Sequence, residues 1–253
     1  MQQTILITGA TSGFGAAIAR RFARAGYQII ITGRRKERLQ ELGEYLEREY
    51  GVSVVTLCFD VRNRSEVTEA ISGLEEKIAT IDILVNNAGL ASGLAPIDEG
   101  DPDDWEVMID TNLKGLLFVT RQVLPWMKKQ GSGHVINIGS TAGKVAYRNG
   151  NVYCATKYAV DALNQSMRID LLQYGIKVTA INPGMAETEF SLVRFKGDAE
   201  RAAKVYEGIK PLQAEDIADI AYYCASLPAH VCINDLTVTC TEQANGIYSI
   251  KNL

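Results

Sequence analysis

Short segments rich in isoleucine and valine alternate with amphipathic stretches along the whole chain, and this alternation constrains the fold more than any other feature. The segments that predict strands are Thr4–Thr8, Gln28–Thr32, Ser53–Phe59, Asp82–Asn86, His134–Ile138, Lys177–Ile181 and Leu236–Thr239. The stretches that predict helices are Gly15–Ala25, Lys36–Tyr50, Arg64–Ala79, Asp103–Lys129, Asn151–Tyr174 and Ala214–Ser226. Strands separated by helices pair in parallel, and right-handed crossovers place the helices on both faces. The sequence therefore predicts an α/β fold, a doubly wound Rossmann-type parallel sheet of about seven strands.

Length and composition limit the organisation of the chain. The 253 residues, of which 47% are hydrophobic and 22% charged, fit one globular α/β domain. No internal repeat, linker or low-complexity segment divides them. We therefore expect residues 1–253 to form a single domain.

Charge and composition exclude several classes of function. The net charge of −4 and the pI of about 5.4 argue against a nucleic-acid partner. No apolar run approaches the ~20 residues of a membrane span. The N-terminal residues Met1 to Thr4 lack the basic segment of a signal peptide. The two histidines, His134 and His230, have no ligand cluster at metal spacing, so no metal is expected.

Cysteine usage indicates a reducing compartment. The five cysteines are scattered and form no Cys-x-x-Cys pair: Cys58, Cys154, Cys224, Cys232 and Cys240. An odd, scattered set suits free and mostly buried thiols. We therefore expect a cytoplasmic location.

A glycine-rich turn follows the first predicted strand directly and leads into a helix. The turn consists of Thr8, Gly9, Ala10, Thr11, Ser12, Gly13, Phe14 and Gly15. Glycines let the backbone approach a pyrophosphate closely, and the helix N-terminus presents N–H groups to it. The spacing is Gly-x-x-x-Gly-x-Gly rather than Gly-x-Gly-x-x-Gly, and a purely structural loop is the alternative. The position directly after the first strand favours a dinucleotide site.

The residues after the second predicted strand favour NADP over NAD. An NAD site would place Asp or Glu there for the ribose 2′-hydroxyl, but the run is Thr32-Gly33-Arg34-Arg35-Lys36. A guanidinium binds a 2′-phosphate through paired charge-assisted hydrogen bonds, whereas a carboxylate repels it. We predict Arg34 as the main phosphate ligand and Arg35 as a secondary one. The alternative is a solvated basic helix start, although cations are unfavourable at a helix N-terminus.

Two further strand ends carry candidate cofactor contacts. Asp60 either accepts a hydrogen bond from the adenine amino group, with Val61 adding a backbone contact, or caps the helix that follows. Asn87 is expected to make a strand-end or cofactor hydrogen bond. The small residues Ala88 and Gly89 let the chain turn beside a ribose.

A tyrosine and a lysine four residues apart, Tyr153 and Lys157, are candidates for acid–base chemistry. At this spacing on a helix the two side chains lie on one face. A nearby ammonium favours the phenolate, so we expect the pKa of Tyr153 to lie below the ordinary value of about 10. Such a phenol is a usable general acid or base near neutral pH. Because this spacing also occurs by chance in many helices, the pair needs support from the rest of the chain.

Ser140 and Asn112 are candidate polar groups near this pair. Ser140 follows the fifth predicted strand, at the carboxyl edge of the sheet where ligands bind. No Gly-x-Ser-x-Gly elbow is present, so Ser140 fits a hydrogen-bond donor that orients a carbonyl oxygen better than a nucleophile. Asn112 lies inside a long predicted helix, where asparagine is a poor helix former. It is either a solvated helix position or a polar insertion that holds a water near Lys157.

These motifs together resemble the short-chain dehydrogenase/reductase family over almost the whole chain. The motifs are Thr8–Gly15, Asn86–Gly89, Asn112, Ser140 and Tyr153 to Lys157. The resemblance implies that Tyr153 donates or removes the hydroxyl proton, and that Lys157 holds the ribose hydroxyls and lowers the tyrosine pKa. It further implies that Ser140 polarises the substrate oxygen and that Asn112 completes a water relay. Pro183-Gly184 falls where the family binds the nicotinamide end of the cofactor.

Several stretches resemble one branch of this family, the NADP-dependent 3-hydroxy acid dehydrogenases, with sulfoacetaldehyde reductases as near relatives. The stretches are Gly33–Arg35, Gly139–Gly143, Gly150–Tyr153, Thr188–Phe190, Val193–Asp198 and Leu227–Val231. The branch oxidises serine, allo-threonine and related 3-hydroxy acids, or reduces malonic semialdehyde. The resemblance thus implies hydride transfer between the nicotinamide of NADP and a small anionic substrate, with Thr188 among the cofactor contacts.

An anionic substrate requires a cation near its carbonyl group. Arg148 lies on the loop before Tyr153, and Arg194 lies in the late stretch 187–213, where we expect a substrate lid. The alternatives are a surface arginine for Arg148 and an ion pair with a nearby glutamate for Arg194. We expect Ser140, Tyr153 and these two arginines to bind the substrate.

Two other functions share parts of this pattern. A 3-oxoacyl reductase or a broad-specificity carbonyl reductase of the same family would have the same catalytic residues and differ in the loop and lid. A non-catalytic NADP-binding sensor would keep the glycine turn and Arg34 but would not need the tyrosine.

Two long predicted helices carry apolar residues on more than one face. These residues are Leu116, Leu117, Phe118, Val119, Val160, Leu163, Met167 and Leu171. Excess apolar helix surface indicates a subunit interface, and the resemblance implies a homotetramer. The tail Ile247–Leu253 is a candidate contact with a neighbouring subunit.

Overall fold

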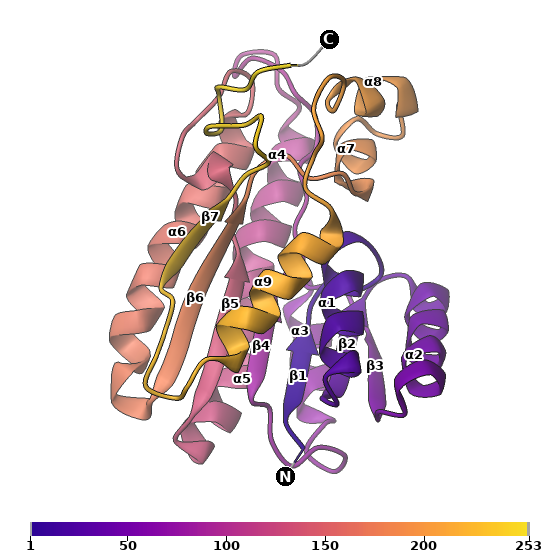
Figure 1. The fold of residues 1–253 in the computed structure, drawn as a ribbon, viewed down its shortest axis with the longest axis vertical. Helices are drawn as coiled ribbons and strands as arrows, with labels where there is room; N and C mark the ends of the chain where they lie inside the picture. Colours follow the sequence, from indigo (N-terminus) through magenta and orange to yellow (C-terminus); the bar gives the residue numbers. More distant parts are fainter. Residues whose placement is uncertain (1, 252–253) are drawn as a thin grey trace.

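The computed structural model describes residues 2–251, which form a central parallel sheet covered by helices (Figure 1). The seven strands follow the order β3-β2-β1-β4-β5-β6-β7. The strands are β1 (Thr4–Ile7), β2 (Gln28–Gly33), β3 (Val54–Cys58), β4 (Ile83–Asn86), β5 (Gly133–Ile138), β6 (Ile176–Pro183) and β7 (Asp235–Val238). The predicted doubly wound Rossmann-type sheet is confirmed. The final two residues of the proposed tail contact, Ile247–Leu253, lie outside the described residues.

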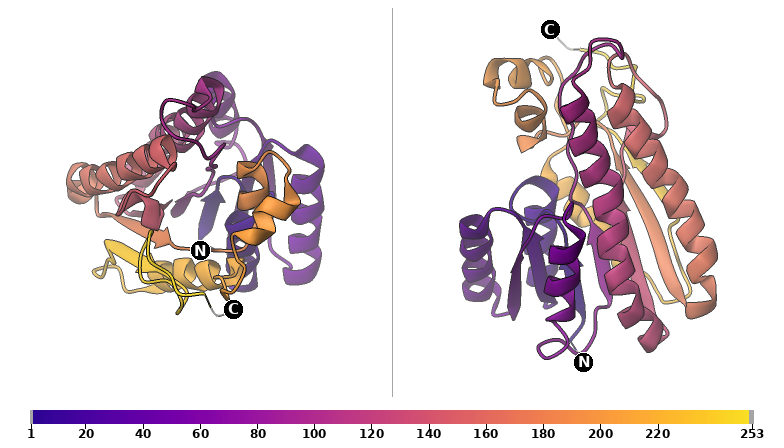
Figure 2. Two further views of the ribbon diagram at one scale, coloured as in Figure 1. Left: turned by 90° about the horizontal axis from the view of Figure 1, so that it is seen from above. Right: turned by 180° about the vertical axis from the view of Figure 1, so that it is seen from behind.

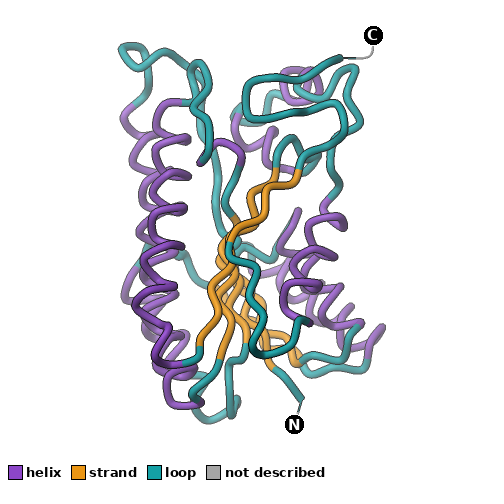
Figure 3. Tube along the Cα trace, turned by 60° about the vertical axis from the view of Figure 1, so that its left-hand side comes forward, coloured by secondary structure: helices purple, strands orange, loops and turns teal. Residues whose placement is uncertain are grey.

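Helices cover both faces of this sheet, as Figure 3 shows with the strands between two helical layers. One layer contains α1 (Gly13–Arg24), α2 (Lys36–Tyr50) and α9 (Ala214–Ser226). The other contains α3 (Arg64–Ser72), α5 (Leu116–Gln130) and α6 (Asn151–Leu171). Successive strand side chains point to opposite faces, so Ile5 and Ile7 join the first core while Leu6 joins the second.

The stretch predicted as one helix, Asp103–Lys129, is helical throughout, but its middle turn is wider than an α-helical turn. Helix α4 (Pro102–Ile109) is followed by a π-helical turn, Asp110–Gly115, before α5 begins. The wider turn contains Asn112, and π-helical segments often occur at functional sites. The helix predicted over Arg64–Ala79 is shorter than expected: α3 ends at Ser72.

Residues 187–213 form an excursion above the carboxyl ends of the strands (Figures 1 and 2). They contain two short helices, α7 (Glu189–Arg194) and α8 (Ala199–Lys204). The two ends of the excursion are joined, since the Glu187 N–H donates to the Leu212 carbonyl at 2.9 Å. The excursion is therefore a closed loop that stands over one edge of the sheet.

Most of the apolar residues expected to be in excess on α5 and α6 are buried within the chain. Val119, Val160, Met167 and Leu171 belong to the core between the sheet and these helices. Apolar packing against the sheet therefore explains most of the pattern, which is not by itself evidence of an interface. The exposed apolar side chains on these helices include Leu117, Tyr158, Ile169 and, just beyond α6, Leu172.

Three further features bear on the expectations from composition. Within residues 2–251, no helix combines the length and the hydrophobicity that crossing a bilayer requires. The same residues bring together no group of three or more His, Cys, Asp or Glu side chains that could hold a metal ion. All five cysteines are free.

Candidate active site

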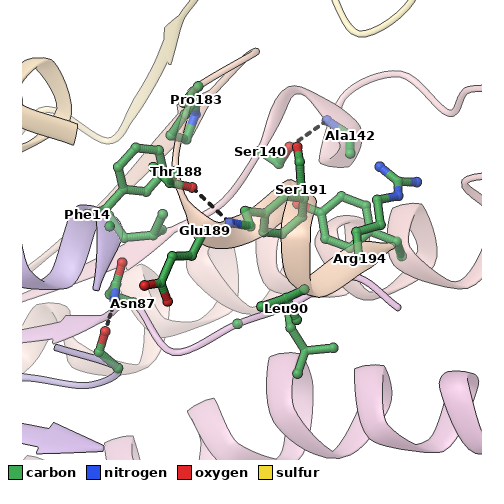
Figure 4. A pocket seen from close by; sticks show the side chains of 18 of the residues that line it. Phe14, Asn87, Leu90, Ser140, Ala142, Pro183, Thr188, Glu189, Ser191 and Arg194 are labelled. Atoms are coloured by element: carbon green, nitrogen blue, oxygen red, sulfur yellow. Dashed lines mark hydrogen bonds between the residues drawn. The ribbon is translucent and has the colours of Figure 1, made fainter. Parts of the chain in front are cut away.

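A cavity of about 590 Å³ opens at the carboxyl edge of the sheet, between the glycine turn and residues 187–213. Figure 4 shows side chains that line it, among them Phe14, Ser140 and Arg194. Every residue proposed from the sequence for cofactor, substrate or catalysis lines this cavity except Gly15 and Asn112. The fold thus brings residues from the first and the last third of the chain to one place.

The glycine turn has the shape that its sequence requires. Gly9 and Gly13 have φ values of +66° and +51°, which L side chains rarely adopt. A Cβ on Gly15 would collide with the carbonyl oxygen of Gly9 and the side chain of Asn87. Helix α1 begins at Gly13, and its N-cap residue Ser12 makes no side-chain cap bond. An uncapped helix N-terminus behind a tight glycine turn fits a pyrophosphate.

The two arginines after β2 differ in what they bind. The Arg34 side chain is 56% exposed, and one guanidinium nitrogen lies 3.6 Å from a carboxylate oxygen of Asp60. Arg35 donates through Nη2 to Thr11 Oγ1 at 2.7 Å and to Ser12 Oγ at 2.8 Å. Its Nη1 donates to the carboxylate of Glu189 at 2.8 Å. Arg34 is therefore open to an incoming phosphate, whereas most of the guanidinium of Arg35 is occupied.

Asp60 does not cap the next helix, so that alternative is wrong. The cap of α3 is Asn63, whose side chain accepts hydrogen bonds from the N–H groups of Ser65 and Glu66. The Asp60 carboxylate accepts from Arg62 Nη2 at 2.6 Å. Burial alone would raise the pKa of Asp60, but the hydrogen bonds and charge of Arg62 hold that pKa below its ordinary value. Asp60 and the buried Val61 both line the cavity, and their contact with adenine stays a prediction.

Asn87 ties the end of β4 to the glycine turn. Its Nδ2 donates to the carbonyl oxygens of Thr8 and Gly9 at 2.8 and 3.1 Å. The backbone N–H groups of Asn87 and Ala88 both donate to Thr8 Oγ1. These contacts fit the strand-end role for Asn87, and they leave Ala88 and Gly89 on the cavity wall.

Asn112 is buried and holds two segments together, so the solvated alternative is wrong. Its Nδ2 donates to the Leu90 carbonyl at 2.8 Å and to Thr156 Oγ1 at 3.1 Å, and its Oδ1 accepts from the Leu90 N–H at 2.8 Å. A Cβ on Gly89 would lie 3.3 Å from Asn112 Oδ1 and 3.6 Å from Lys157 Nζ. The π-helical turn thus places an amide close to the lysine that the sequence singled out.

Tyr153 is buried at the cavity wall, and its pKa moves opposite to the expected direction. The residue is 8% exposed, and the centre of its ring lies 5.5 Å from that of Phe190. Burial raises the pKa of Tyr153, while the Ser140 side chain and the charge of Arg194 act to lower it. The prediction of a lowered pKa is therefore wrong for the chain by itself.

The position and burial of Lys157 explain part of why the pKa of Tyr153 is not lowered. Its Nζ donates to the carbonyl oxygen of Ile138 at 2.9 Å and lies 6.0 Å from the centre of the Tyr153 ring. Burial lowers the pKa of Lys157 to about 8. The ammonium is therefore directed at the end of β5, next to Ser140, and its own charge is weakened by desolvation.

Arg194 lies over two aromatic rings at the other end of the cavity. Its guanidinium carbon is 5.4 Å from the centre of the Tyr147 ring and 5.7 Å from that of Tyr153. The glutamate ion pair suggested as its alternative is absent among the described residues, because nearby Glu189 binds other arginines. Arg148 also lines the cavity, but its side chain is exposed, as the surface alternative predicts.

Sequence reasoning assigned no role to several residues at this site. Tyr147, Glu189, Phe190 and Ser191 all line the cavity. Ser191 Oγ and Tyr206 Oη lie 2.6 Å apart, and this hydrogen bond ties α7 to a later part of the same segment. Glu189 and Phe190 fall in Thr188–Phe190, one of the stretches that resemble the branch, and that resemblance is the signal that could have pointed to them. Tyr147 lies in a loop and Ser191 in a short helix without periodic pattern.

Pro183 and Gly184 lie at the end of β6, and Thr188 caps α7 by accepting a hydrogen bond from the Phe190 N–H at 3.2 Å. Together with the uncapped turn after β1 and the Ser140, Tyr153 and Lys157 group, they define one continuous site at the carboxyl edge of a doubly wound sheet. Such a site is that of a nicotinamide dinucleotide-dependent oxidoreductase.

The comparison with known proteins agrees with this class. A family model of short chain dehydrogenases matches residues 3–198, and the chain belongs to this family.

The names of similar proteins indicate a more specific branch of the family. The chain is 50% identical over 241 residues to the NADP-dependent 3-hydroxy acid dehydrogenase YdfG of Salmonella typhi, covering 95% of this chain and 96% of the relative. It is 47% identical over 251 residues to sulfoacetaldehyde reductase 2 of Chromohalobacter salexigens, covering 99% of both. The solved closed form of serine dehydrogenase complexed with NADP+ matches with a TM-score of 0.92 and 46% identity, over 99% of this chain and 100% of that one. The resemblance to the 3-hydroxy acid dehydrogenase branch is confirmed.

Proposed function

We propose that the protein is an NADP-dependent oxidoreductase that transfers a hydride between nicotinamide and the carbonyl or hydroxyl carbon of a small anionic substrate. The candidates are 3-hydroxy acids such as serine or allo-threonine, and aldehydes such as malonic semialdehyde or sulfoacetaldehyde. One observation carries the proposal. A single cavity joins the glycine turn to the buried Tyr153, and the Arg194 guanidinium lies 5.7 Å from the centre of that ring. The names of the relatives support the same substrate class.

The cofactor side is formed by the glycine turn and the residues after β2. The turn receives the pyrophosphate, and the exposed Arg34 binds the 2′-phosphate by charge-assisted hydrogen bonds. Pro183, Gly184 and Thr188 line the nicotinamide end of the cavity. When bound, NADP supplies or accepts the hydride, and the chain contributes placement and electrostatics.

The chemistry is carried by Tyr153 with Ser140 beside it. In reduction the phenol gives its proton to the substrate oxygen, and in oxidation the phenolate removes the hydroxyl proton. Ser140 donates a hydrogen bond to the same oxygen and so favours charge developing there. Lys157 binds the ribose hydroxyls, and its charge favours the phenolate. Asn112 holds the Leu90 segment against α6 and is the residue we assign to a water relay.

The substrate anion is bound by Arg194, with Arg148 at the rim of the cavity. Support comes from the position of Arg194 over the Tyr147 and Tyr153 rings and from its lack of a carboxylate partner among the described residues. Residues 187–213, called the lid segment below, close this end of the cavity. The whole chain acts as one catalytic domain.

An NADP-linked oxidation screen tests the proposal. Serine, allo-threonine, 3-hydroxypropionate, isethionate and a neutral alcohol are offered with NADP or NAD, and reduced cofactor is followed by absorbance. We expect turnover of one or more anionic substrates with NADP and little with the neutral alcohol. Preference for the neutral alcohol, or for a 3-oxoacyl thioester in the reverse direction, would favour the other reductases of the family. NADPH binding without turnover of any substrate would favour the sensor.

Location and assembly complete the proposal. Five free cysteines fit the cytoplasm, and the apolar side chains Leu117, Tyr158 and Ile169, exposed on α5 and α6, support a homotetramer. Figure 2 shows α4–α5 and α6 side by side on the face seen from behind. Light scattering behind a sizing column measures the mass, for which we expect four chains.

A further inference from the structure

A carboxylate of the lid segment is bound by two arginines of the cofactor side. Glu189, the first residue of α7, accepts a hydrogen bond from Arg35 Nη1 at 2.8 Å and from Arg38 Nη1 at 2.7 Å. The Glu189 side chain is 39% exposed. Arg35 continues the connection, because it also donates to Thr11 and Ser12 of the glycine turn. A chain of charge-assisted hydrogen bonds thus runs from Arg38 of α2 through Glu189 of the lid segment and Arg35 to the glycine turn.

The ion pairs of Glu189 leave net positive charge at this edge of the sheet for a 2′-phosphate. The arginine cluster contains four guanidinium groups and two carboxylates: Arg34, Arg35, Arg38, Arg62, Asp60 and Glu189. Two positive charges remain after pairing, and a phosphate monoester carries a charge of about −1.5 to −2 at neutral pH. Arg34 has the longest ion pair of the four, 3.6 Å to Asp60, and the most exposed side chain, so it is the most accessible to a phosphate. The 2′-phosphate and Glu189 can therefore be bound together.

Glu189 faces the cofactor side, whereas the other end of α7 faces the substrate side. Figure 4 shows Glu189 and Arg194 on opposite sides of the cavity. The far end is held separately, since Gly93 N–H donates to the Arg194 carbonyl at 3.0 Å and Lys196 Nζ lies 3.0 Å from Asp104. The ion pairs of Glu189 are the ones that close the lid segment onto the glycine turn, where Thr188 faces Gly13.

We propose that Arg38, Glu189 and Arg35 form a latch, and that Glu189 and Arg38 are positioning residues that slow the release of NADP(H). The proposal rests on the proposed function, because it requires the dinucleotide to lie between the turn and the lid segment. To leave, the dinucleotide needs α7 to move from the turn, and that movement breaks both ion pairs. The sequence predicted Arg35 as a secondary phosphate ligand. In this proposal its main role is to link the glycine turn to the lid segment through hydrogen bonds.

Release of NADPH measured by stopped-flow fluorescence tests the latch. The protein with bound NADPH is mixed with excess NADP+, and the decay of NADPH fluorescence gives the dissociation rate constant. Because exposed ion pairs are individually weak, we expect Glu189→Gln to raise this rate constant by about threefold to tenfold. Arg38 has Glu189 as its one ion-pair partner among the described residues, so Arg38→Met is expected to give a smaller rise of the same kind. The double variant is expected to match Glu189→Gln alone.

The matched control is Glu187→Gln, which removes the same charge two residues earlier from an exposed side chain without an ion pair in the described part of the chain. Its release rate is expected to equal that of the unsubstituted protein. High salt should reduce the ratio of the NADPH dissociation rate constant of Glu189→Gln to that of the unsubstituted protein, because salt screens the ion pairs of Glu189.

Unchanged or slower release in Glu189→Gln would overturn the latch, as would an equal rise in Glu187→Gln. Failure of the unsubstituted protein to bind NADPH would overturn the proposed function and the latch with it. Bound NADPH with unchanged release overturns the latch alone.

Discussion

The two halves of the carboxyl edge handle charge in opposite ways. Beyond β1 to β3 the cations are exposed: the Arg34 side chain is 56% exposed and its neighbours pair with surface carboxylates. Beyond β4 to β6 the ionisable groups are buried, with Tyr153 and Lys157 each 8% exposed and their pKa values moved towards the neutral forms. In the proposed function the first half attracts an anion from water, and the second moves a proton where water is excluded.

This difference has a consequence for substitutions. Exposed charges act through attraction, so their loss weakens binding and leaves the chemistry intact. Buried groups act through their protonation state, so their loss affects turnover or folding. Substitutions in the two halves should therefore separate these two kinds of behaviour.

Tyr153→Phe should give the largest effect, a loss of turnover of roughly 10²–10⁴-fold, because it removes the group that transfers the proton. NADPH affinity, measured by fluorescence titration, should stay near that of the unsubstituted protein. Because phenylalanine keeps the ring that packs against Phe190, turnover close to that of the unsubstituted protein would show that the hydroxyl does not transfer the proton.

Lys157→Met should stabilise the cofactor-free protein at pH 7. The folded pKa of Lys157 is about 8 and the ordinary value is 10.5, so burying the charged form penalises the folded state. That penalty is full below pH 8 and disappears as pH rises to 10.5, and it amounts to at most about 3 kcal/mol. Urea unfolding at pH 7 and at pH 10 measures the difference between the two proteins, which should shrink at the higher pH. A variant that is less stable at pH 7 would show that the hydrogen bond to Ile138 outweighs the desolvation.

Arg34→Ala should weaken NADPH binding by roughly tenfold to a hundredfold, the value of one or two charge-assisted hydrogen bonds, and should leave NADH binding unchanged. Fluorescence titration with both cofactors measures this preference. Arg35→Ala serves as the comparison, because its guanidinium already binds Thr11, Ser12 and Glu189. A greater loss of NADPH preference in Arg35→Ala would reverse the assigned roles.

Arg194→Met should raise the KM for an anionic aldehyde by about tenfold, as expected for a lost ion pair in a partly desolvated site, and should leave a neutral aldehyde unaffected. Arg148→Met, at an exposed position, should have a smaller effect on the same two substrates. Steady-state reduction of a semialdehyde acid and a neutral aldehyde measures both. An equal loss on the two substrates would exclude an anion-specific role for the substituted arginine.

The fold could be predicted almost completely because hydrophobic periodicity determines it. The alternation of Ile- and Val-rich segments with helices gave the sheet, and the glycine turn and strand ends gave most of the cavity lining. Tyr153, Lys157 and Ser140 share this edge because parallel strands end there. These features depend on local pattern and on topology, both of which are present in the order of residues.

The features that the sequence pattern could not predict depend on tertiary packing and burial. The spacing of Tyr153 and Lys157 predicted a lowered tyrosine pKa, but the lysine is directed at Ile138 and desolvation dominates both groups. The π-helical turn around Asn112 resembles ordinary helix in sequence. The partner of Arg35 is Glu189, 154 residues away, and no local signal connects them.

In the proposed function the buried phenol of Tyr153 exchanges the proton with the substrate. The most direct test of this exchange is the pH dependence of single-turnover oxidation with NADP in excess, followed by NADPH absorbance from neutral to alkaline pH. Because burial raises the pKa of Tyr153, the phenolate fraction and the rate should keep rising with pH, about tenfold per unit below that pKa, and Tyr153→Phe should abolish the rise. A flat profile in the unsubstituted protein, with hydride transfer rate-limiting, would refute Tyr153 as the base.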